Sequence, residues 1–304
     1  MNQDIINKLK EISSDLEICT NENMSRHTTF RTGGPASLFL RPGSLDDLNK
    51  VICVLKESKV EYLILGNGSN LLVSDKGYNG AVISLTRLAD IHLEDGNTIY
   101  AEGGAMNSFI ASFARDNSLT GFEFAAGIPG TIGGAMIMNA GAYGGEMKLV
   151  TKEVRALNSE GELLSLSNEA MEFGYRTSAL KGKGFVVVAV LLQLEQGDQE
   201  LITGKMQELA LKRKEKQPLE YPSAGSTFKR PEGYFAGKLI EDAGLRGYSV
   251  GGAYVSEKHC GFVINKGDAT SLDIYRLIGD VQKKVYDTFG VKLEPEVIML
   301  GDFE

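Results

Sequence analysis

Glycine is the feature that most constrains how this chain can fold. Thirty-six of its 304 residues are glycine, and they follow no collagen-like period. Glycine adopts backbone conformations that other residues avoid, and it lets the backbone approach another group closely. The sequence therefore predicts many tight turns in a globular protein. Its 42% hydrophobic and 24% charged residues are typical of a soluble fold.

The length predicts more than one domain, because a single hydrophobic core stops growing at about 250–300 residues. We expect three regions, at residues 1–80, 81–197 and 198–304. In the first region, apolar spacing predicts a helix over 4–17. It also predicts a β-α-β arrangement, made of a strand at 37–40, a helix at 45–59 and a strand at 62–65.

The middle region has the pattern of a mostly antiparallel sheet. The cluster at 158–161 predicts a hairpin, and the strands are predicted by short apolar runs at 81–85, 98–101, 152–157 and 185–194. In the third region we expect helices at 200–216 and 271–289. Ser271 is the expected N-cap of the second helix, and Gly290 lies just beyond its end.

Charge and cysteine content argue against several classes of function. Thirty-two basic and forty acidic residues give a net charge of -8, which disfavours a nucleic-acid binder. Three scattered cysteines, and three histidines without metal-ligand spacing, predict neither a disulfide framework nor a metal site.

The N-terminus lacks the apolar stretch of a secretory signal, and no stretch reaches membrane-spanning length. We therefore expect a cytoplasmic protein without a membrane partner.

Two glycine-rich loops are candidates for holding a ligand. The first, GNGSNLL at 66–72, follows the strand at 62–65, so its backbone amides can cradle a diphosphate. It lacks the third glycine of a dinucleotide-binding fingerprint and the ending of a P-loop, and an ordinary tight turn is the alternative. The second loop, 126–145, interleaves glycines with Ile, Ala and Met, which suits a flat ring. Close packing of a helix on a sheet is its alternative.

Six motifs, taken in order, resemble one enzyme family. They are Arg31-Thr32-Gly33-Gly34, GNGSNLL at 66–72, AGIPGTIGGA at 126–135, Tyr175-Arg176-Thr177-Ser178, Gly225-Ser226-Thr227-Phe228-Lys229 and Leu293-Glu294-Pro295-Glu296. Over nearly the whole chain they are similar to UDP-N-acetylenolpyruvoylglucosamine reductase, in the smaller type that lacks a tyrosine-bearing loop. The resemblance implies an α+β fold. A two-part FAD-binding domain of the vanillyl-alcohol-oxidase (PCMH) type is expected at 1–80 and 81–197, and an α+β substrate-binding domain at 198–304.

The resemblance also implies a reaction in peptidoglycan precursor synthesis. The enolpyruvyl ether of UDP-N-acetylglucosamine becomes the lactyl ether of UDP-N-acetylmuramate, with NADPH as electron donor. Non-covalent FAD passes the hydride from its N5 atom, because a flavin can relay hydride between two substrates. We expect the enzyme to be a monomer.

Three residues are expected to carry the chemistry, because hydride addition leaves an enolate-like charge that then needs a proton. Arg176 would pair with the substrate carboxylate and the developing enolate through its planar donor fork, and a surface salt bridge is its alternative. The resemblance implies that Ser226 donates the proton, although a serine in a glycine turn is usually a turn hydrogen bonder. Glu296 would orient the enolpyruvyl group or a relay water. Glu294 is the fallback, since strand alternation puts both carboxylates on one face.

The remaining expected site residues hold the cofactor or the substrate. For FAD they are Arg31, Thr32, Gly33, Gly66, Asn67, Gly68, Ser69, Asn70, Leu71, Gly127, Pro129, Gly130, Thr131, Gly133, Gly134, Ala140 and Gly141. For the substrate they are Tyr175, Lys216, Lys229, Arg230 and Lys258. Most of the basic run 212–216 is interpreted as a solvated helix end, and Cys260 as a small packed residue.

Two other functions stay open at this point. One is a different FAD oxidoreductase of the same fold, and the other is a nucleotide-binding relative that has lost the reaction. Pro35 follows Gly34, so neither a thiol nor an imidazole stands ready for covalent attachment, and acid precipitation should release the flavin. The joint presence of Arg176, Ser226 and Glu296 argues against an inactive relative.

Overall fold

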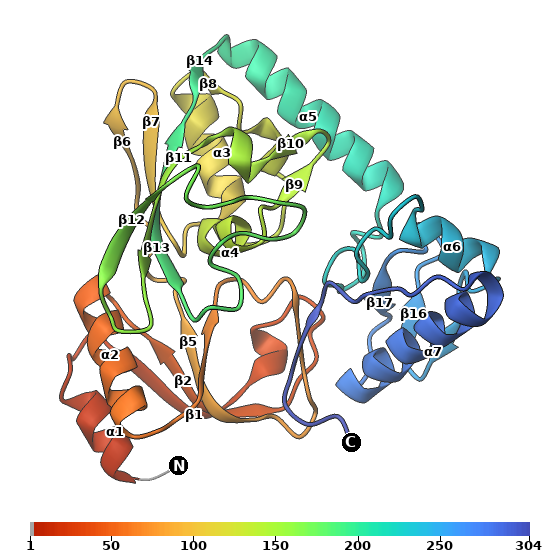
Figure 1. Cartoon of the computed structure of the whole chain (residues 1–304), viewed down its shortest axis with the longest axis horizontal. Helices are drawn as coiled ribbons and strands as arrows, with labels where there is room; N and C mark the ends of the chain where they lie inside the picture. Colours follow the sequence, from red (N-terminus) through yellow and green to blue (C-terminus); the bar gives the residue numbers. More distant parts are fainter. Residues whose placement is uncertain (1–2) are drawn as a thin grey trace. The chain divides into compact units, whose positions relative to one another are not determined.

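The computed structural model describes residues 3–304, which form two compact units built from non-contiguous segments (Figure 1). Unit 1 contains the chain up to Cys19 together with 39–67 and 81–213, and unit 2 contains 20–38, 68–80 and 214–304. The division falls within three strands, β1 (Glu17–Asn23), β2 (Pro35–Arg41) and β5 (Tyr78–Ser84). With β3 (Tyr62–Leu65) they form a four-stranded sheet in the order β1-β2-β5-β3.

The predicted β-α-β arrangement is present. Helix α2 (Leu45–Glu57) connects β2 to β3, and β3 runs parallel to β5. The side chain of Ser44 caps α2 by accepting from the Asp47 N–H, as expected for a serine before an apolar-periodic segment. The predicted helix over 4–17 is too long, because α1 (Gln3–Lys10) ends at Lys10 and the polar, mostly exposed residues 17–23 form β1. Helix α1 packs against α2.

The middle of the chain forms the predicted antiparallel sheet, with five strands in the order β12-β11-β13-β7-β6. The run at 81–85 was wrongly expected in this sheet, because its residues 81–84 lie in β5, which pairs with β3 in the four-stranded sheet. Its strands are β6 (Ile91–Asp95), β7 (Thr98–Glu102), β11 (Thr151–Leu157), β12 (Leu163–Ser167) and β13 (Val186–Gln193). The predicted hairpin joins β11 to β12, and Asn158 accepts the N–H groups of Glu160 and Glu162 through its side chain. Strand β13 lies at the centre of the sheet and is buried as far as Leu192.

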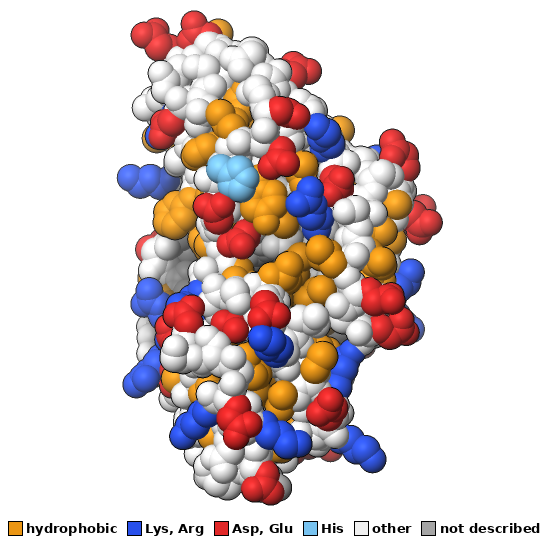
Figure 2. Space-filling view, turned by 90° about the vertical axis from the view of Figure 1, so that its left-hand side faces the viewer, with side chains coloured by type: hydrophobic (Ala, Val, Ile, Leu, Met, Phe, Trp, Pro, Cys, Tyr) orange, Lys and Arg blue, Asp and Glu red, His pale blue; other side chains and the backbone are white. Residues whose placement is uncertain are grey.

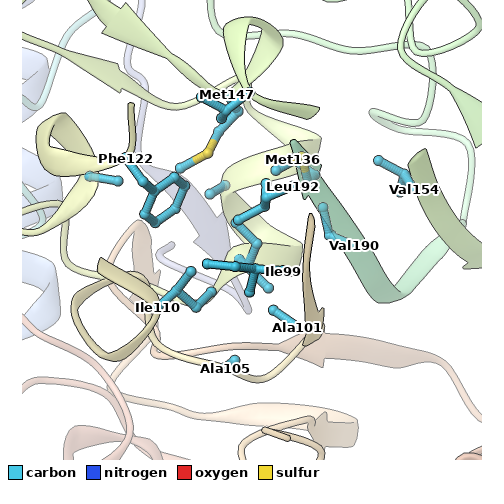
Figure 3. Packing of buried hydrophobic residues seen from close by; sticks show 14 of the residues in the cluster. Ile99, Ala101, Ala105, Ile110, Phe122, Met136, Met147, Val154, Val190 and Leu192 are labelled. Atoms are coloured by element: carbon cyan, nitrogen blue, oxygen red, sulfur yellow. The ribbon is translucent and has the colours of Figure 1, made fainter. Parts of the chain in front are cut away.

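Short helices cover this sheet and enclose the core of unit 1 (Figure 3). Helix α4 (Ile132–Ile137) packs against β13 and β7, and Met136, Leu192, Ile99 and Phe122 meet in the cluster. The other elements of this unit are α3 (Asn107–Asp116), β8 (Leu119–Thr120), η2 (Glu123–Ala125), β9 (Gly141–Ala142), β10 (Gly145–Glu146), η3 (Met147–Leu149) and β14 (Glu195–Gln196). Helix α5 (Gln199–Lys216) follows, as predicted, and only its last three residues belong to unit 2.

Unit 2 has its own core around helix α7 (Ser271–Phe289). This helix packs against a three-stranded sheet, and strands β4 (Leu71–Val73) and β18 (Ile298–Leu300) pair parallel to each other. The remaining elements are η1 (Met24–Arg26), α6 (Ala236–Asp242), β15 (Ser249–Val250), β16 (Ala253–Val255) and β17 (Val263–Asn265). Cys260 is buried in this core, where burial raises the pKa of its thiol.

The cap of α7 differs from the prediction by one residue. Thr270, not Ser271, is the N-cap, because its hydroxyl accepts from the Asp273 N–H and the Asp273 carboxylate accepts from the Thr270 N–H. This reciprocal pair is a capping box. Gly290 ends the helix at φ +69°, as predicted.

Acidic and basic side chains are interspersed on the face of the molecule shown in Figure 2. Among the helices formed by residues 3–304, none is both long enough and apolar enough to span a bilayer.

Candidate active site

Two glycines of the first glycine-rich loop lie where a side chain would not fit. In unit 1, a Cβ on Gly66 would lie 2.3 Å from the Thr131 hydroxyl oxygen. In unit 2, Gly68 has φ +60°, and a Cβ there would lie 1.9 Å from the His27 carbonyl oxygen. No hydrogen bond in the described part of the chain uses the N–H groups of Gly68, Ser69 or Asn70. The loop therefore offers consecutive free amides, which is the donor set an anion such as a diphosphate requires.

The turn at 31–34 packs against the end of β4 and the residue that follows it. Arg31 has φ +57° and an exposed side chain, whereas Gly33 has φ +122°, and a Cβ added there would lie 2.9 Å from the Val73 Cβ. Thr28 donates its hydroxyl to the Thr32 carbonyl oxygen over 2.9 Å. The Thr32 hydroxyl is buried, and no partner for it lies within residues 3–304. A buried hydroxyl without a partner is costly, so this turn fits a polar ligand.

The second glycine-rich loop divides into packing glycines and open ones. Gly133 donates its N–H to the Gly103 carbonyl oxygen over 2.9 Å, and a Cβ would lie 2.8 Å from that same oxygen. Close packing of α4 on the sheet, the alternative stated above, therefore explains Gly133. Gly134 is exposed, and the nearest group to its Cβ position is the Thr131 hydroxyl at 3.9 Å. Its open face is available to a ligand.

Arg176 occupies a turn that is tied to the end of α4. Its φ of +55° is unusual for a residue with a side chain and marks a position that its surroundings impose. Three hydrogen bonds hold the turn: Ser178 Oγ donates to the Ile137 carbonyl oxygen, Asn139 Nδ2 to that of Gly174, and Lys181 Nζ to that of Arg176. The guanidinium carbon lies 5.4 Å from the centre of the exposed Tyr175 ring.

Ser226 is exposed between Gly225, at φ +74°, and the fully buried Thr227. Thr227 anchors the turn with three bonds. Its N–H donates to the Gly261 carbonyl oxygen over 2.9 Å, its hydroxyl accepts from the Val263 N–H over 3.0 Å, and its carbonyl oxygen accepts from the Glu296 N–H over 2.8 Å. The structure thus brings the segments of Ser226 and Glu296 together in unit 2, while Arg176 belongs to unit 1.

The two neighbouring carboxylates differ in their surroundings. Glu294 is exposed and accepts from Lys229 Nζ over 2.8 Å, and this hydrogen bond lowers the pKa of Glu294. Glu296 is half-buried, and Asn70 Nδ2 donates to its carbonyl oxygen over 3.0 Å. Because the pKa of Glu294 is lowered below its usual value, its carboxylate is a poor candidate for moving a proton.

Comparison with known proteins identifies the family. Residues 36–167 match the family model described as FAD binding domain, and residues 217–300 match the C-terminal domain of UDP-N-acetylenolpyruvoylglucosamine reductase. A UDP-N-acetylenolpyruvoylglucosamine reductase from Caldanaerobacter subterraneus subsp. tengcongensis is 54% identical over 98% of both chains. The chain belongs to the UDP-N-acetylenolpyruvoylglucosamine reductase family. A reductase of the same name from Clostridioides difficile is 49% identical over 99% of both chains.

Solved structures agree with this assignment and with the predicted fold class. The crystal structure of the UDP-N-acetylenolpyruvylglucosamine reductase from Thermus caldophilus matches at 32% identity and a TM-score of 0.80, over 94% of this chain and 99% of that one. The glucose dehydrogenase Phl p 4.0202 shares the fold at 10% identity and a TM-score of 0.53. The predicted α+β flavoprotein fold is therefore confirmed, and the chain is an FAD-binding oxidoreductase of peptidoglycan precursor synthesis.

The side chains expected to bind the substrate of this reductase lie in different settings. Lys216 is exposed at the end of α5. Lys258 Nζ donates to the Lys214 carbonyl oxygen over 2.6 Å, so it caps that helix. The Arg230 guanidinium carbon lies 4.0 Å from the centre of the Phe235 ring, and its Nε donates to the Tyr234 carbonyl oxygen.

Arg213 was not among the expected site residues of the reductase, and it is the exception in a run whose other four residues are exposed, as a solvated helix end requires. Its side chain is half-buried, and a Cβ on Gly127 would lie 2.7 Å from Nη1. Burial lowers the pKa of Arg213, and no acidic partner for it lies within residues 3–304. The sequence does not indicate that Arg213 is buried near Gly127, because nothing distinguishes it from the other charged residues of the run at 212–216.

Proposed function

We propose that this chain reduces the enolpyruvyl group of UDP-N-acetylglucosamine enolpyruvate with electrons from NADPH, forming UDP-N-acetylmuramate. The observation that carries the proposal is the pairing of the Ser226 turn with the Glu296 segment. Ser226 is exposed, and the fully buried Thr227 that follows it accepts the backbone N–H of the half-buried Glu296. An exposed hydroxyl on a turn held in this way suits delivery of one proton to a carbanion.

The chain's own residues fit FAD. In unit 2, the free amides of the first loop suit the diphosphate, and the partnerless Thr32 hydroxyl suits a polar group of the ligand. In unit 1, the open face at Gly134 suits a flat ring. Non-covalent FAD would supply hydride transfer between the nicotinamide and the enolpyruvyl carbon. We assign its binding to residues 1–197, in two parts divided at 80, and substrate binding to 198–304. The two matching family models, at 36–167 and 217–300, support a break between the FAD-binding and C-terminal parts that lies between 167 and 217.

Arg176 is assigned to the carboxylate of the enolpyruvyl group. Hydride addition at the terminal carbon moves negative charge onto the carbon beside this carboxylate and its oxygens. A guanidinium group stabilises that charge by two parallel hydrogen bonds. Three hydrogen bonds hold the turn of Arg176, so the guanidinium is positioned before the substrate binds. Tyr175 is assigned to the same substrate.

Ser226 is assigned as the proton donor. Its hydroxyl proton passes to the carbon that bears the carboxylate, and the resulting alkoxide takes a proton from solvent. Glu296 is assigned to orient the enolpyruvyl group or the relay water that returns this proton. The half-buried position of Glu296 and its backbone bond to Thr227 support this choice, and the lowered pKa of the exposed Glu294 argues against its neighbour.

The charged groups of the UDP moiety need cations. We assign them to Lys216, Lys229, Arg230 and Lys258, of which Lys216 is exposed at a helix end and Arg230 is ordered on Phe235. We also propose a cytoplasmic monomer. Its three cysteines are free thiols, which suits a reducing compartment.

One anaerobic titration tests the proposed function. The purified protein should be yellow, should bleach with NADPH, and should recover its colour with the enolpyruvyl UDP-sugar, while acid precipitation should release the flavin. Bleaching without recovery would indicate a different FAD oxidoreductase, and failure of both steps in flavin-loaded protein would indicate an inactive relative. Sedimentation of the same sample measures the oligomeric state.

A further inference from the structure

Strands β4 and β18 pair through a ladder of backbone hydrogen bonds, and at Glu296 a side chain takes the place of the backbone donor. Ile298 pairs with Leu71, and its N–H donates to the Asn70 carbonyl oxygen over 3.0 Å. In a regular parallel ladder the next bond would join the Glu296 carbonyl oxygen to the backbone N–H of Asn70. Here the Asn70 side chain makes that bond instead, with Nδ2 lying 3.0 Å from the Glu296 carbonyl oxygen.

The other bond expected at this step of the ladder is also redirected. The Gly68 carbonyl oxygen, which a regular ladder would pair with the Glu296 N–H, accepts from the Thr29 N–H. The Glu296 N–H donates to the Thr227 carbonyl oxygen over 2.8 Å. Both polar backbone groups of Glu296 are therefore fixed, one by the segment of Ser226 and one by the side chain of Asn70.

Because the Asn70 side chain makes this bond, only one of the two polar backbone groups of Asn70 is used within the ladder. Its carbonyl oxygen holds Ile298, whereas its N–H takes part in no hydrogen bond within the described part of the chain. That N–H continues the series of free amides from Gly68 and Ser69. An asparagine can do this because its side-chain amide carries donors in addition to its backbone N–H.

We propose that Asn70 is a positioning residue for Glu296. At the end of the β4–β18 ladder, the Asn70 side chain donates to the Glu296 carbonyl oxygen in place of the Asn70 backbone N–H, and this bond fixes the Glu296 peptide. The backbone N–H of Asn70 stays free to bind an anion. The catalytic consequence rests on the role proposed for Glu296. Asn70 is expected above to bind the cofactor, and the assignment made here gives its side chain a different task.

The test uses Asn70→Ala and the isosteric Asn70→Asp, which keeps the side-chain size but removes the donor. Asn79→Ala, at an exposed asparagine of β5, is the matched control. Hydrogen exchange of the peptide spanning 294–300 is measured in the full chain without flavin. Both Asn70 variants should exchange faster there, and Asn79→Ala should not. Unchanged exchange in folded Asn70→Asp would overturn the positioning role, whatever the kinetics show.

The kinetic arm uses flavin-loaded enzyme and the two half-reactions. In Asn70→Ala, bleaching by NADPH and the affinity for FAD should change little, whereas reoxidation by the enolpyruvyl substrate should slow by roughly 10- to 100-fold, because a misplacement of about 1 Å can cost that much. In a Glu296→Gln background, Asn70→Ala should add little further loss. Full additivity, or a defect confined to FAD affinity, would overturn the proposal. If Glu296→Gln is itself silent while exchange rises, the proposed role of Glu296 fails instead.

Discussion

Glu296 donates its backbone N–H to the carbonyl oxygen of Thr227, the residue directly after Ser226 in the chain. This bond joins two segments that lie about seventy residues apart in the sequence, and the Phe228–Pro295 bridge extends the pairing. The hydroxyl assigned as proton donor and the carboxylate assigned to assist it therefore share one backbone frame. Changes to this frame should alter the second half-reaction more than the first.

Removing the Ser226 hydroxyl should separate the two half-reactions. In Ser226→Ala, flavin bleaching by NADPH should keep its rate, and reoxidation by the enolpyruvyl substrate should fall by about 10²- to 10⁴-fold, the usual contribution of a positioned acid. Stopped-flow absorbance of the flavin measures both. Ser249→Ala, at an exposed serine of β15, is the control and should match the parent enzyme. Equal rates in both half-reactions for Ser226→Ala would refute the assignment.

Thr227→Val should destabilise unit 2. The substitution keeps the shape of the side chain but removes the hydroxyl that accepts the Val263 N–H in a fully buried position. An unsatisfied buried N–H costs about 1–3 kcal/mol. Chemical denaturation measures this free energy of unfolding, with Thr288→Val on the exposed face of α7 as a control expected within about 0.5 kcal/mol of the parent. A loss no larger than that of the control would contradict the anchoring role.

Gly68→Ala should disrupt the first loop, and Gly144→Ala should not disrupt the second. Both glycines have positive φ, at +60° and +88°, so both substitutions carry a conformational cost of about 1–2 kcal/mol. Only Gly68 also meets backbone, with the His27 carbonyl oxygen 1.9 Å from the added Cβ, whereas nothing lies within 4 Å at Gly144. Melting temperature and flavin fluorescence titration compare the two variants. Similar losses of FAD affinity would contradict this account.

His259 should make the protein less stable in mild acid. Its Nδ1 accepts from the Gly261 N–H over 3.1 Å, and burial lowers the pKa of the imidazole below its usual value of 6.5. The unfolded chain then binds the proton more readily, so stability is retained above about pH 6.5 and declines as the pH falls toward the lowered folded-state pKa. His259→Asn keeps an acceptor but cannot titrate. Its melting temperature should depend less on pH between 7 and 5, and parallel curves for the two proteins would exclude the effect.

Local sequence signals predicted much of the fold, because apolar spacing and capping residues act over a few positions. The bounds of α7 follow from such signals, and its N-cap was missed by one residue because Thr270 and Ser271 are both good caps. Strand β1 was missed because EICTNEN has neither apolar alternation nor a continuous apolar run. Its existence depends on pairing in the sheet, which a local pattern does not encode.

The candidate site shows the same limit. Motif resemblance proposed Ser226 and Glu296, but the hydrogen bonds that hold their segments together were not predictable. The bond from Asn70 to Glu296 spans 226 positions, and strand alternation at 294–296 did not reveal that Lys229 engages the first of the two glutamates. Likewise, nothing in the sequence shows that Arg213 turns toward Gly127.

The core around α7 includes Phe30 and Leu72, which come from far upstream of the other residues in it. A recombinant fragment that starts at residue 214 would lack both, and with them the strand that pairs with β18. A fragment made for crystallography or inhibitor screening should therefore include the segments that carry Phe30 and Leu72. Without them, the C-terminal fragment would expose apolar surface and aggregate.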